Sequence, residues 1–325
     1  MIERTHWHPV ADAQTIADGP VAARLLGDDL VLWRDPQGAV HAWPDRCPHR
    51  GAKLSLGRIE GGHLECPYHG WQFEGGGRCM RVPALPGFVP PATHRVQAFE
   101  AREDHGLVFV RLASGGDAMP LFEAEGDDRL RKLNCGPYDV AASAPRIIEN
   151  FLDMAHFGFV HEGWLGARDA TAIDTYRVEE TPTGLRATDC KAWQPQSNLH
   201  STAPAQVEYG YEVTGPYTAV LTKIPEAGTV AVAGWREAIA LFICPREPER
   251  SRVWFRLAVA DFDSSDEKLR AFQDTIFLQD RPVLESQTPR LLPLDPRAEL
   301  HTAADRASAA YRRYLSRLGI TFGVL

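Results

Sequence analysis

The sequence lacks the features that mark nucleic-acid-binding, secreted and membrane-spanning proteins. Its 35 basic and 43 acidic residues are interspersed and give a formal net charge of -8. No basic stripe can follow a phosphate backbone, so we expect no nucleic-acid partner. The longest uncharged apolar stretch, AIALFIC at 238–244, is too short to cross a bilayer, and MIERTHWHPV at the start lacks the apolar run of a signal peptide. We therefore expect a soluble, cytoplasmic protein that does not enter a membrane.

Cysteine is also scarce, with six in 325 residues. In a chain without a secretory signal, so few cysteines argue against a disulfide framework and favour metal binding or simple burial. Only Cys47 and Cys66 have a histidine close behind them in matching segments, CPHRG and CPYHGW. These two cysteines are therefore the candidates for metal binding.

Turn signals divide the first third of the chain into short apolar alternations. Between residues 22 and 112, LVLWR, AVHAW, VQAFEAR and GLVFVRL are separated by stretches such as DPQG. This pattern predicts a small antiparallel β domain. The stretch ASGGDAMP at 113–120 has the composition of a linker, so we place one domain at 1–116 and a second at 117–325.

The second domain has a different pattern. We expect a helical segment around 145–161, β-rich sequence from about 171 to 262, and helices at Ser265–Gln287 and Ala303–Leu318. The simplest account is an α+β fold, in which helices flank an antiparallel sheet in a helix-grip-like arrangement.

The two cysteine segments together offer four metal ligands. Cys47-x-His49 and Cys66-x-x-His69 are separated by 16 residues, and nearby glycine and proline residues suit tight, stiff loops. A structural zinc site also uses two cysteines and two histidines, but it usually pairs the cysteines on one knuckle. Here each loop carries one of each, which favours a two-iron cluster with both cysteines on one iron and both histidines on the other. Over residues 5–112 the chain resembles the Rieske proteins.

A second group of possible ligands lies in ENFLDMAHFGFVHEG at 149–163, where Asp153, His156 and His161 interrupt an apolar helical pattern. Each has an ordinary alternative, because such histidines are usually core or surface residues and Asp153 and His156 could be a helix-surface pair. Histidines five residues apart lie roughly 140° apart on a regular helix. If both bind one ion, the helix must therefore loosen near Gly158.

Two histidines and a carboxylate on one face of a ferrous ion leave positions open for dioxygen and substrate, the design of non-haem iron oxygenases. Asp280 is the candidate carboxylate, because Pro282 should disrupt the helix there and leave the aspartate facing inward. An aspartate two residues before a proline is equally typical of a helix N-cap. The residues alone leave both interpretations open, and Asp274 is the next candidate.

Nearly the whole chain resembles the oxygenase component of Rieske non-haem iron oxygenases, through the Rieske segments and Asn150-x2-Asp153-x2-His156-x4-His161. The stretches HFGFVHEGWLG and AYRRYLSRLGITFGVL resemble the saxitoxin-pathway hydroxylases and, more broadly, members that hydroxylate or demethylate without a small β subunit. The resemblance implies one [2Fe-2S] cluster held by Cys47, His49, Cys66 and His69, and one mononuclear iron held by His156, His161 and Asp280.

The resemblance also implies partners. In the family, the residue at Asp153 links the iron-bound histidine of one chain to the cluster histidine, here His69, of its neighbour, and the lack of a β-subunit signal favours a homotrimer. No G-x-G-x-x-G or other flavin or nicotinamide signature is present in the sequence. Electrons must therefore come from a separate reductase or ferredoxin.

Three interpretations of function remain at this stage. The first is a monooxygenase that hydroxylates or oxidatively demethylates an aromatic or polycyclic small molecule, and the second is cis-dihydroxylation of an aromatic ring. The third is an electron-transfer or zinc-binding module with an unrelated C-terminal domain. We expect the substrate pocket among residues 190–245 and the helix near 280, with Trp193, Tyr217 and Trp235 as possible lining residues.

Overall fold

The computed structural model describes residues 1–116, 118–231 and 235–325, which divide into two compact units. Arg4–Met119 form the N-terminal unit, and Pro120–Leu325 form the C-terminal unit together with Met1–Glu3. The expected linker at 113–120 includes residue 117, which lies outside the described residues. Within the described ranges, none of the helices has the length and apolarity needed to span a bilayer.

The N-terminal unit is built from three small antiparallel sheets, with strand orders β1–β10–β9, β2–β3–β4 and β5–β6–β7–β8. The short helix η1, Ile2–Thr5, has residues in both units. The bounds of the other elements are β1 His8–Asp12, η2 Ala13–Ile16, β2 Val21–Leu25, β3 Asp28–Arg34, β4 Val40–Pro44, η3 Leu54–Leu56, β5 Arg58–Glu60, β6 His63–Glu65, β7 Gln72–Phe73, β8 Cys79–Arg81, β9 Glu100–Asp104 and β10 Leu107–Arg111. The expected β domain is therefore present, and it begins earlier than residue 22.

Large aromatic residues form the core of this unit. Trp33 on β3 and Trp43 on β4 are fully buried, and their rings meet edge to face at 5.1 Å. Phe73 packs against Trp43 from the third sheet at 6.4 Å. The side chains of Cys47 and Cys66 belong to the same buried cluster. The loops that carry these cysteines are thereby fixed to the sheets.

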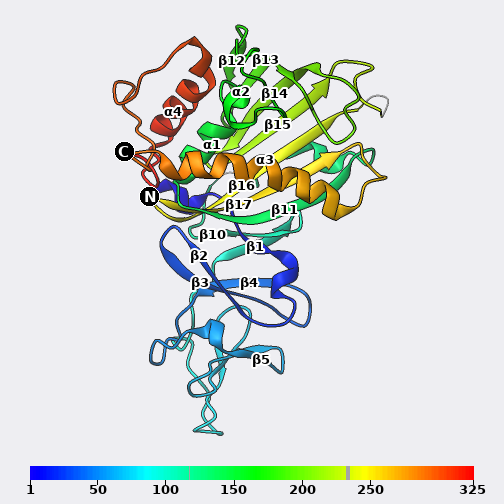
Figure 1. The fold of residues 1–325 in the computed structure, drawn as a ribbon. Helices are drawn as coiled ribbons and strands as arrows, with labels where there is room; N and C mark the ends of the chain where they lie inside the picture. Colours follow the sequence, from blue (N-terminus) through cyan, green and yellow to red (C-terminus); the bar gives the residue numbers. More distant parts are fainter. Residues whose placement is uncertain (117, 232–234) are drawn as a thin grey trace. The chain divides into compact units, whose positions relative to one another are not determined.

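The C-terminal unit contains one seven-stranded antiparallel sheet with the order β11–β17–β16–β15–β14–β13–β12. The bounds of its elements are η4 Glu123–Gly126, β11 Arg131–Val140, α1 Ala144–Phe151, α2 Phe157–Val160, β12 Arg177–Glu180, β13 Leu185–Gln194, β14 Ala205–Gly215, β15 Thr218–Pro225, β16 Glu237–Glu247, β17 Arg250–Val259, α3 Asp266–Ser286, η5 Ala303–Asp305 and α4 Arg306–Leu318. The helices α1 and α3 cross one face of this sheet (Figure 1).

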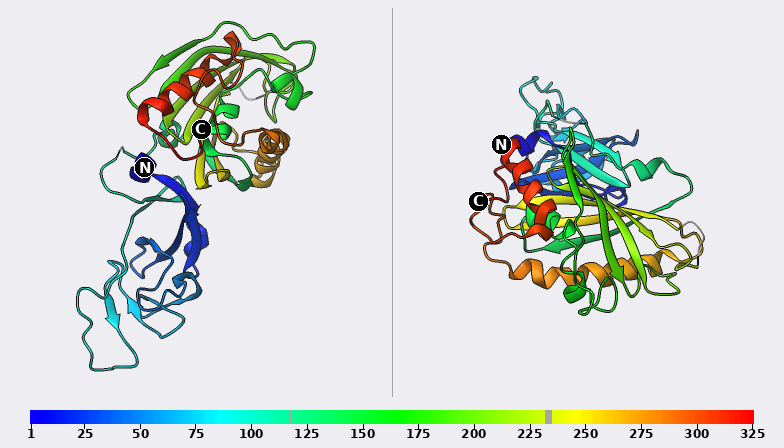
Figure 2. Two further views of the ribbon diagram at one scale, coloured as in Figure 1. Left: turned by 90° about the vertical axis from the view of Figure 1, so that its left-hand side faces the viewer. Right: turned by 90° about the horizontal axis from the view of Figure 1, so that it is seen from above.

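Alternation along the strands explains why one face of the sheet is covered. On β14 the residues Val207, Tyr209, Tyr211 and Val213 are buried, while residues between them are partly or fully exposed. The sheet is strongly curved, and α3 packs near β11 while α4 packs near β12 and β13 (Figure 2). Helices on one side of an antiparallel sheet are the expected α+β arrangement.

Two helix predictions need correction. The segment expected as one helix at 145–161 is broken, because α1 ends at Phe151 and the single turn α2 starts at Phe157. The helix α3 begins after Ser265, whose hydroxyl accepts a hydrogen bond from the Lys268 N–H at 3.3 Å, and it continues through Pro282. Pro282 therefore does not end the helix, and Asp280 is not an N-cap.

Candidate metal centres

The two cysteine loops of the N-terminal unit have the same backbone conformation. The Cys47 N–H donates to the Ala52 carbonyl at 2.8 Å, and the Gly51 N–H donates to the Cys47 carbonyl at 2.9 Å. The second loop repeats the first bond, from the Cys66 N–H to the Trp71 carbonyl at 2.8 Å. Each cysteine therefore starts an equivalent tight loop.

Glycine is required in both loops, because Gly51 and Gly70 have φ angles of 73° and 68°. L-residues with a side chain rarely adopt such angles. The repeated geometry explains the repeated C-P…G pattern of the sequence.

The side chains of these loops converge with sulfur inside and imidazole toward the surface. Cys47 and Cys66 are each 2 % exposed, and burial, together with the adjacent Cys66 thiol, raises the pKa of Cys47 to about 12. The rings of His49 and His69 lie 4.6 Å apart, and His49 stacks on Trp71 at 4.5 Å. Within the described ranges, the buried Nδ1 of His49 has no hydrogen-bond partner. Two adjacent buried thiols and an unpartnered imidazole nitrogen fit a Rieske cluster.

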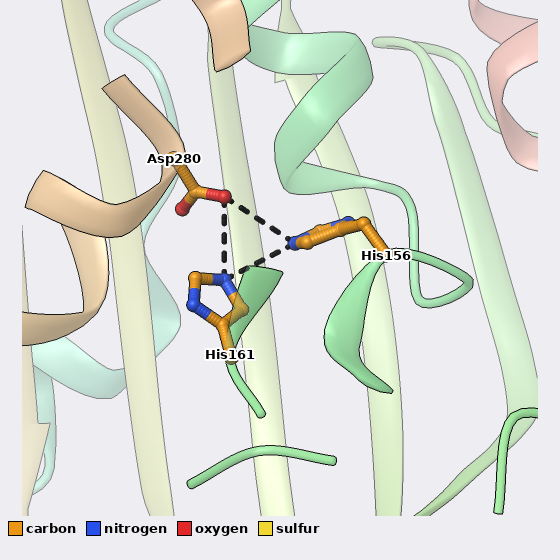
Figure 3. A group of neighbouring side chains, drawn as sticks. All are labelled: His156, His161 and Asp280. Carbon is orange, nitrogen blue, oxygen red and sulfur yellow. Dashed lines mark hydrogen bonds and ion pairs between the residues drawn. The ribbon is translucent and has the colours of Figure 1, made fainter. Parts of the chain in front are cut away.

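A second convergence of ligand atoms lies in the C-terminal unit (Figure 3). The Nε2 atoms of His156 and His161 are 3.2 Å apart, and Oδ1 of Asp280 lies 3.4 Å from the first and 3.2 Å from the second. Asn150 steadies the carboxylate by donating from Nδ2 to Oδ1 at 3.3 Å. Asp280 is 7 % exposed, so it faces inward as expected.

The loosening expected between the two histidines is visible in the backbone. His156 is the N-cap and His161 the C-cap of the four-residue helix α2, Phe157–Val160. Because the helix lasts for only one turn, both imidazoles can reach the same point (Figure 3). Gly158 allows this turn to pack closely, since a Cβ there would lie 2.8 Å from the Ala167 carbonyl oxygen.

Each of these histidines has an acceptor on its outer nitrogen. Asp153 Oδ2 lies 2.8 Å from Nδ1 of His156, and Oε1 of Gln279 lies 2.8 Å from Nδ1 of His161. The proton of each neutral ring therefore sits on Nδ1, which leaves the lone pair of Nε2 directed at the triad. The sequence pattern indicated Asp153 but not Gln279, whose only signal was its position beside Asp280.

Electrostatics support a cation at the triad. Two Nε2 lone pairs and a carboxylate oxygen, all acceptors, lie within 3.4 Å of one another. Ligands about 2.1 Å from a metal at right angles are separated by roughly 3 Å, so the triangle suits three cis positions. Burial acts to raise the pKa of Asp153, but hydrogen bonds from His156 and Ala155 outweigh it and hold that pKa below its usual value. The residues fit a mononuclear iron.

The triad forms part of the wall of a cavity between the sheet and α1, α2 and α3. Most of the lining is aromatic or aliphatic, including Phe151, Tyr211, Leu221, Ile239, Phe255 and Phe277. Polar side chains also reach it, among them Lys223, Glu237 and Gln273. The lining includes residues from both regions in which we expected the substrate pocket, 190–245 and the helix near Asp280, and also residues of α1, α2 and β17.

The aromatic residues suggested for this pocket lie elsewhere. Trp193 on β13 is 38 % exposed, and Tyr217 is buried with its hydroxyl donating to the Phe322 carbonyl at 2.8 Å. Trp235 lines a smaller neighbouring cavity, which shares Glu237 and Gln273 with the main one. Large aromatic residues are poor indicators of a substrate pocket, because they pack equally well in the core of the sheet.

Both units match known domain families. Residues 6–100 match the Rieske [2Fe-2S] domain, and residues 140–319 match the vanillate O-demethylase oxygenase C-terminal domain. The second match covers more than half of the chain. The same pair of domains is what the two convergent ligand sets require.

Several relatives are similar over most of the chain. The methylxanthine N1-demethylase NdmA of Pseudomonas putida is 32% identical, over 97% of this chain and 89% of that protein. The oxygenase component of chloroacetanilide N-alkylformylase from Rhizorhabdus wittichii is 31% identical, over 88% and 86%. A shorter stretch, 34% of this chain, is 42% identical to part of the oxidoreductase NdmD of Pseudomonas putida.

Solved structures agree with these relatives. NdmA of Pseudomonas putida CBB5 with caffeine superposes with a TM-score of 0.83 at 30% identity, covering 96% of this chain and 90% of that one. Dicamba monooxygenase bound to dicamba has a TM-score of 0.79 at 22% identity, with 97% of each chain covered, and shows the fold alone.

These findings decide between the three interpretations. The cofactors are a Rieske [2Fe-2S] cluster and a mononuclear iron, which rules out a simple electron-transfer or zinc-binding module. Relatives that remove N-alkyl and O-methyl groups favour monooxygenation and do not favour cis-dihydroxylation. The chain belongs to the Rieske non-haem iron oxygenases, as the terminal oxygenase component that hydroxylates or oxidatively demethylates its substrate with electrons from a separate reductase.

Proposed function

We propose that this oxygenase removes a methyl group from a nitrogen or oxygen atom of a small aromatic or heteroaromatic molecule. The observation that carries the proposal is the triad of His156, His161 and Asp280 in the wall of a mainly apolar cavity. Relatives named for N1-demethylation of methylxanthine and O-demethylation of dicamba support the same bond class. A mainly apolar wall with a few polar groups is typical of sites for small molecules.

Each half of the chain has its own task in this proposal. Residues 1–116 hold the [2Fe-2S] cluster through Cys47, His49, Cys66 and His69, and residues 117–325 hold the mononuclear iron through the triad. When bound, the cluster and the iron supply electron transfer and dioxygen activation.

The protein's own side chains orient the site and keep it dry. Asp153 and Gln279 hold the two imidazoles in one tautomer and one orientation. Phe151, Phe255 and Phe277 exclude water from the methyl group and restrict how the substrate can lie. Selection of one methyl group then depends on the polar side chains of the cavity, Lys223, Glu237 and Gln273.

The overall reaction balances without a further oxidant. One molecule of dioxygen, two electrons and two protons convert the methyl group to a hydroxymethyl group and release one water. On nitrogen or oxygen, the hydroxymethyl carbon leaves as formaldehyde when its bond to the heteroatom breaks. The heteroatom takes up the hydroxyl proton and becomes N–H or O–H.

We also propose a homotrimer in the cytoplasm. Asp153 accepts hydrogen bonds from the ring and backbone of His156, and its side chain is 24% exposed, which leaves room for a contact with His69 of a neighbouring chain. A heterologous contact closes into a ring when its rotation divides a full turn, and a threefold rotation gives a trimer. The free thiol state of the six cysteines suits a reducing compartment.

The test measures formaldehyde released from N-methyl and O-methyl compounds by the purified oxygenase with a reductase and dioxygen. We expect one formaldehyde per substrate consumed and ¹⁸O from ¹⁸O₂ in formaldehyde that is trapped rapidly. Asp280→Ala should lose mononuclear iron and turnover while keeping the cluster absorption. A diol product that retains its methyl group, or full turnover in Asp280→Ala, would overturn the proposal.

A further inference from the structure

A row of polar side chains on the sheet lines part of the mainly apolar cavity. In the register of the sheet, Tyr209 on β14 pairs with Lys223 on β15, and Lys223 pairs with Glu237 on β16. The next row on the same face, two residues along each strand, is Tyr211, Leu221 and Ile239. Lys223 and Glu237 therefore form an ion pair beside a row of mainly hydrophobic side chains that also line the cavity.

The ion pair is almost fully buried. Lys223 is 4% exposed and Glu237 8%, and Nζ lies 3.3 Å from Oε1. Nζ also donates to the Ser197 carbonyl, and it lies 5.9 Å from the centre of the Tyr209 ring. The fold thus holds the ammonium in place by contacts on several sides.

The carboxylate of Glu237 has fewer hydrogen-bonding partners than it can accept. It has about four lone-pair positions, and within the described ranges Lys223 is its only side-chain partner. Gln273 on α3 is 8% exposed, and its amide makes no side-chain hydrogen bond within the described ranges. Glu237 and Gln273 each line both the main cavity and its smaller neighbour.

The charge balance restricts which ligand can enter. An anionic ligand would be attracted by Lys223 but repelled by Glu237. A cationic ligand would be attracted by Glu237 but repelled by Lys223. In a buried site these forces are screened poorly, and an uncompensated charge is strongly disfavoured. A neutral ligand avoids this penalty, and it can still donate a hydrogen bond to the anionic Glu237.

We propose that Glu237, held in place by Lys223 and assisted by Gln273, is the specificity-determining group for a neutral heterocycle with an N–H beside a carbonyl. The ligand N–H donates to Glu237, and its carbonyl accepts from the amide of Gln273. This inference rests on the proposed demethylation, since it names the class of molecule whose methyl group is removed. The apolar remainder of the ring and its methyl group then lie toward the triad.

The test compares three probes on the oxidised holoenzyme, which does not turn over without electrons. Theobromine has an N–H between two carbonyls, caffeine carries a methyl group at that nitrogen, and dicamba is a carboxylate. Calorimetric titration gives each dissociation constant. Because a hydrogen bond to a charged group contributes roughly ten- to hundredfold in affinity, we expect theobromine to bind at least about tenfold more tightly than caffeine, and dicamba more weakly than either.

Two variants separate charge from shape. Glu237→Gln keeps the volume but leaves Lys223 as a net positive charge, so it should reduce the theobromine preference below about threefold and gain affinity for dicamba. The double variant Lys223→Met/Glu237→Leu removes both charges, and proteins often tolerate replacement of a buried ion pair by hydrophobic residues. It should lose the preference for theobromine without gaining affinity for dicamba. Glu208→Gln, an exposed residue of β14 next to Tyr209, is the matched control and should change neither.

The outcomes are distinguishable from those of the demethylation test. Equal binding of theobromine and caffeine to the wild type, binding of none of the probes, or survival of the preference in both variants would overturn the inference. None of these titrations depends on turnover. Formaldehyde release without a theobromine preference would therefore reject only the assignment of Glu237, whereas the preference without formaldehyde from any methyl compound would reject the proposed reaction.

Discussion

Replacing Gln279 with leucine tests the outer support of the proposed iron site. Gln279 Oε1 is the acceptor 2.8 Å from Nδ1 of His161, and the His161 side chain is 1% exposed, so water cannot readily take its place. A buried N–H left without a partner costs about 1–3 kcal/mol. Loss of such an outer partner typically lowers metal affinity about 10–100-fold, which agrees with that energy. We expect Gln279→Leu to weaken ferrous iron binding by this factor.

The assay exploits the separation of the two metal sites. Mononuclear iron is removed with a chelator that leaves the cluster intact, and ferrous iron is then titrated back while bound iron and visible absorption are both measured. The cluster spectrum should be unchanged in Gln279→Leu, since its ligands belong to the other unit. Gln206→Leu makes the same chemical change at an exposed position of β14 and serves as the control. Wild-type iron affinity in Gln279→Leu would refute the support role.

Three further changes test other parts of the molecule. Cys66→Ser should remove the visible cluster absorption while the mononuclear site still takes up iron, and metal analysis showing both lost would contradict independent sites. Asp153→Asn should retain both metals and the trimer yet lose nearly all turnover. After rapid mixing of the reduced protein with dioxygen and substrate, its cluster should be oxidised slowly. A wild-type rate of cluster oxidation would argue that Asp153 does not link the two histidines. Hydrogen bonding from Arg146 lowers the pKa of Glu299 from 4.5 to about 2, so its stabilising effect is complete above pH 4.5 and is lost as the pH falls toward 2. Thermal unfolding followed over that range should therefore show a shallower acid loss for Glu299→Gln, and an equal slope would refute this account.

The candidate ligands could be predicted because most of them lie in short, local patterns. Cys47 and His49 occupy one loop, and His156 and His161 are five residues apart, so spacing alone limits the possible geometry. The role of Asp280 is harder to predict from the sequence. The residue could be the N-cap of a helix or an inward-facing ligand, and the two interpretations differ only in where α3 begins. That start is set by Ser265, fifteen residues earlier, and by packing of α3 on the sheet rather than by Pro282.

The contacts that sequence could not reveal are those made across the sheet. Lys223 and Glu237 are separated by a long connection and become neighbours only through the register of β15 and β16. Strand register depends on the whole buried face, so a single residue carries little information about its cross-strand partner. For the same reason Trp193 and Tyr217 looked plausible as pocket residues, although one is on the exposed side of β13 and the other is tied to the Phe322 carbonyl.

The two iron-binding candidates differ in the charge of their outer partners, and this difference assigns them different tasks. His161 is buried and bonded to the neutral amide of Gln279, an arrangement that fixes the ring and carries no net charge. His156 is bonded to the ionised Asp153, which remains 24% exposed and also accepts from the backbone N–H groups of Ala155 and His156. A carboxylate fixed by three donors, with part of its surface accessible, is suited to hold a second imidazole outside the unit, whereas the amide of Gln279 is suited only to support. The route by which an electron enters the proposed iron site should therefore pass His156 and not His161.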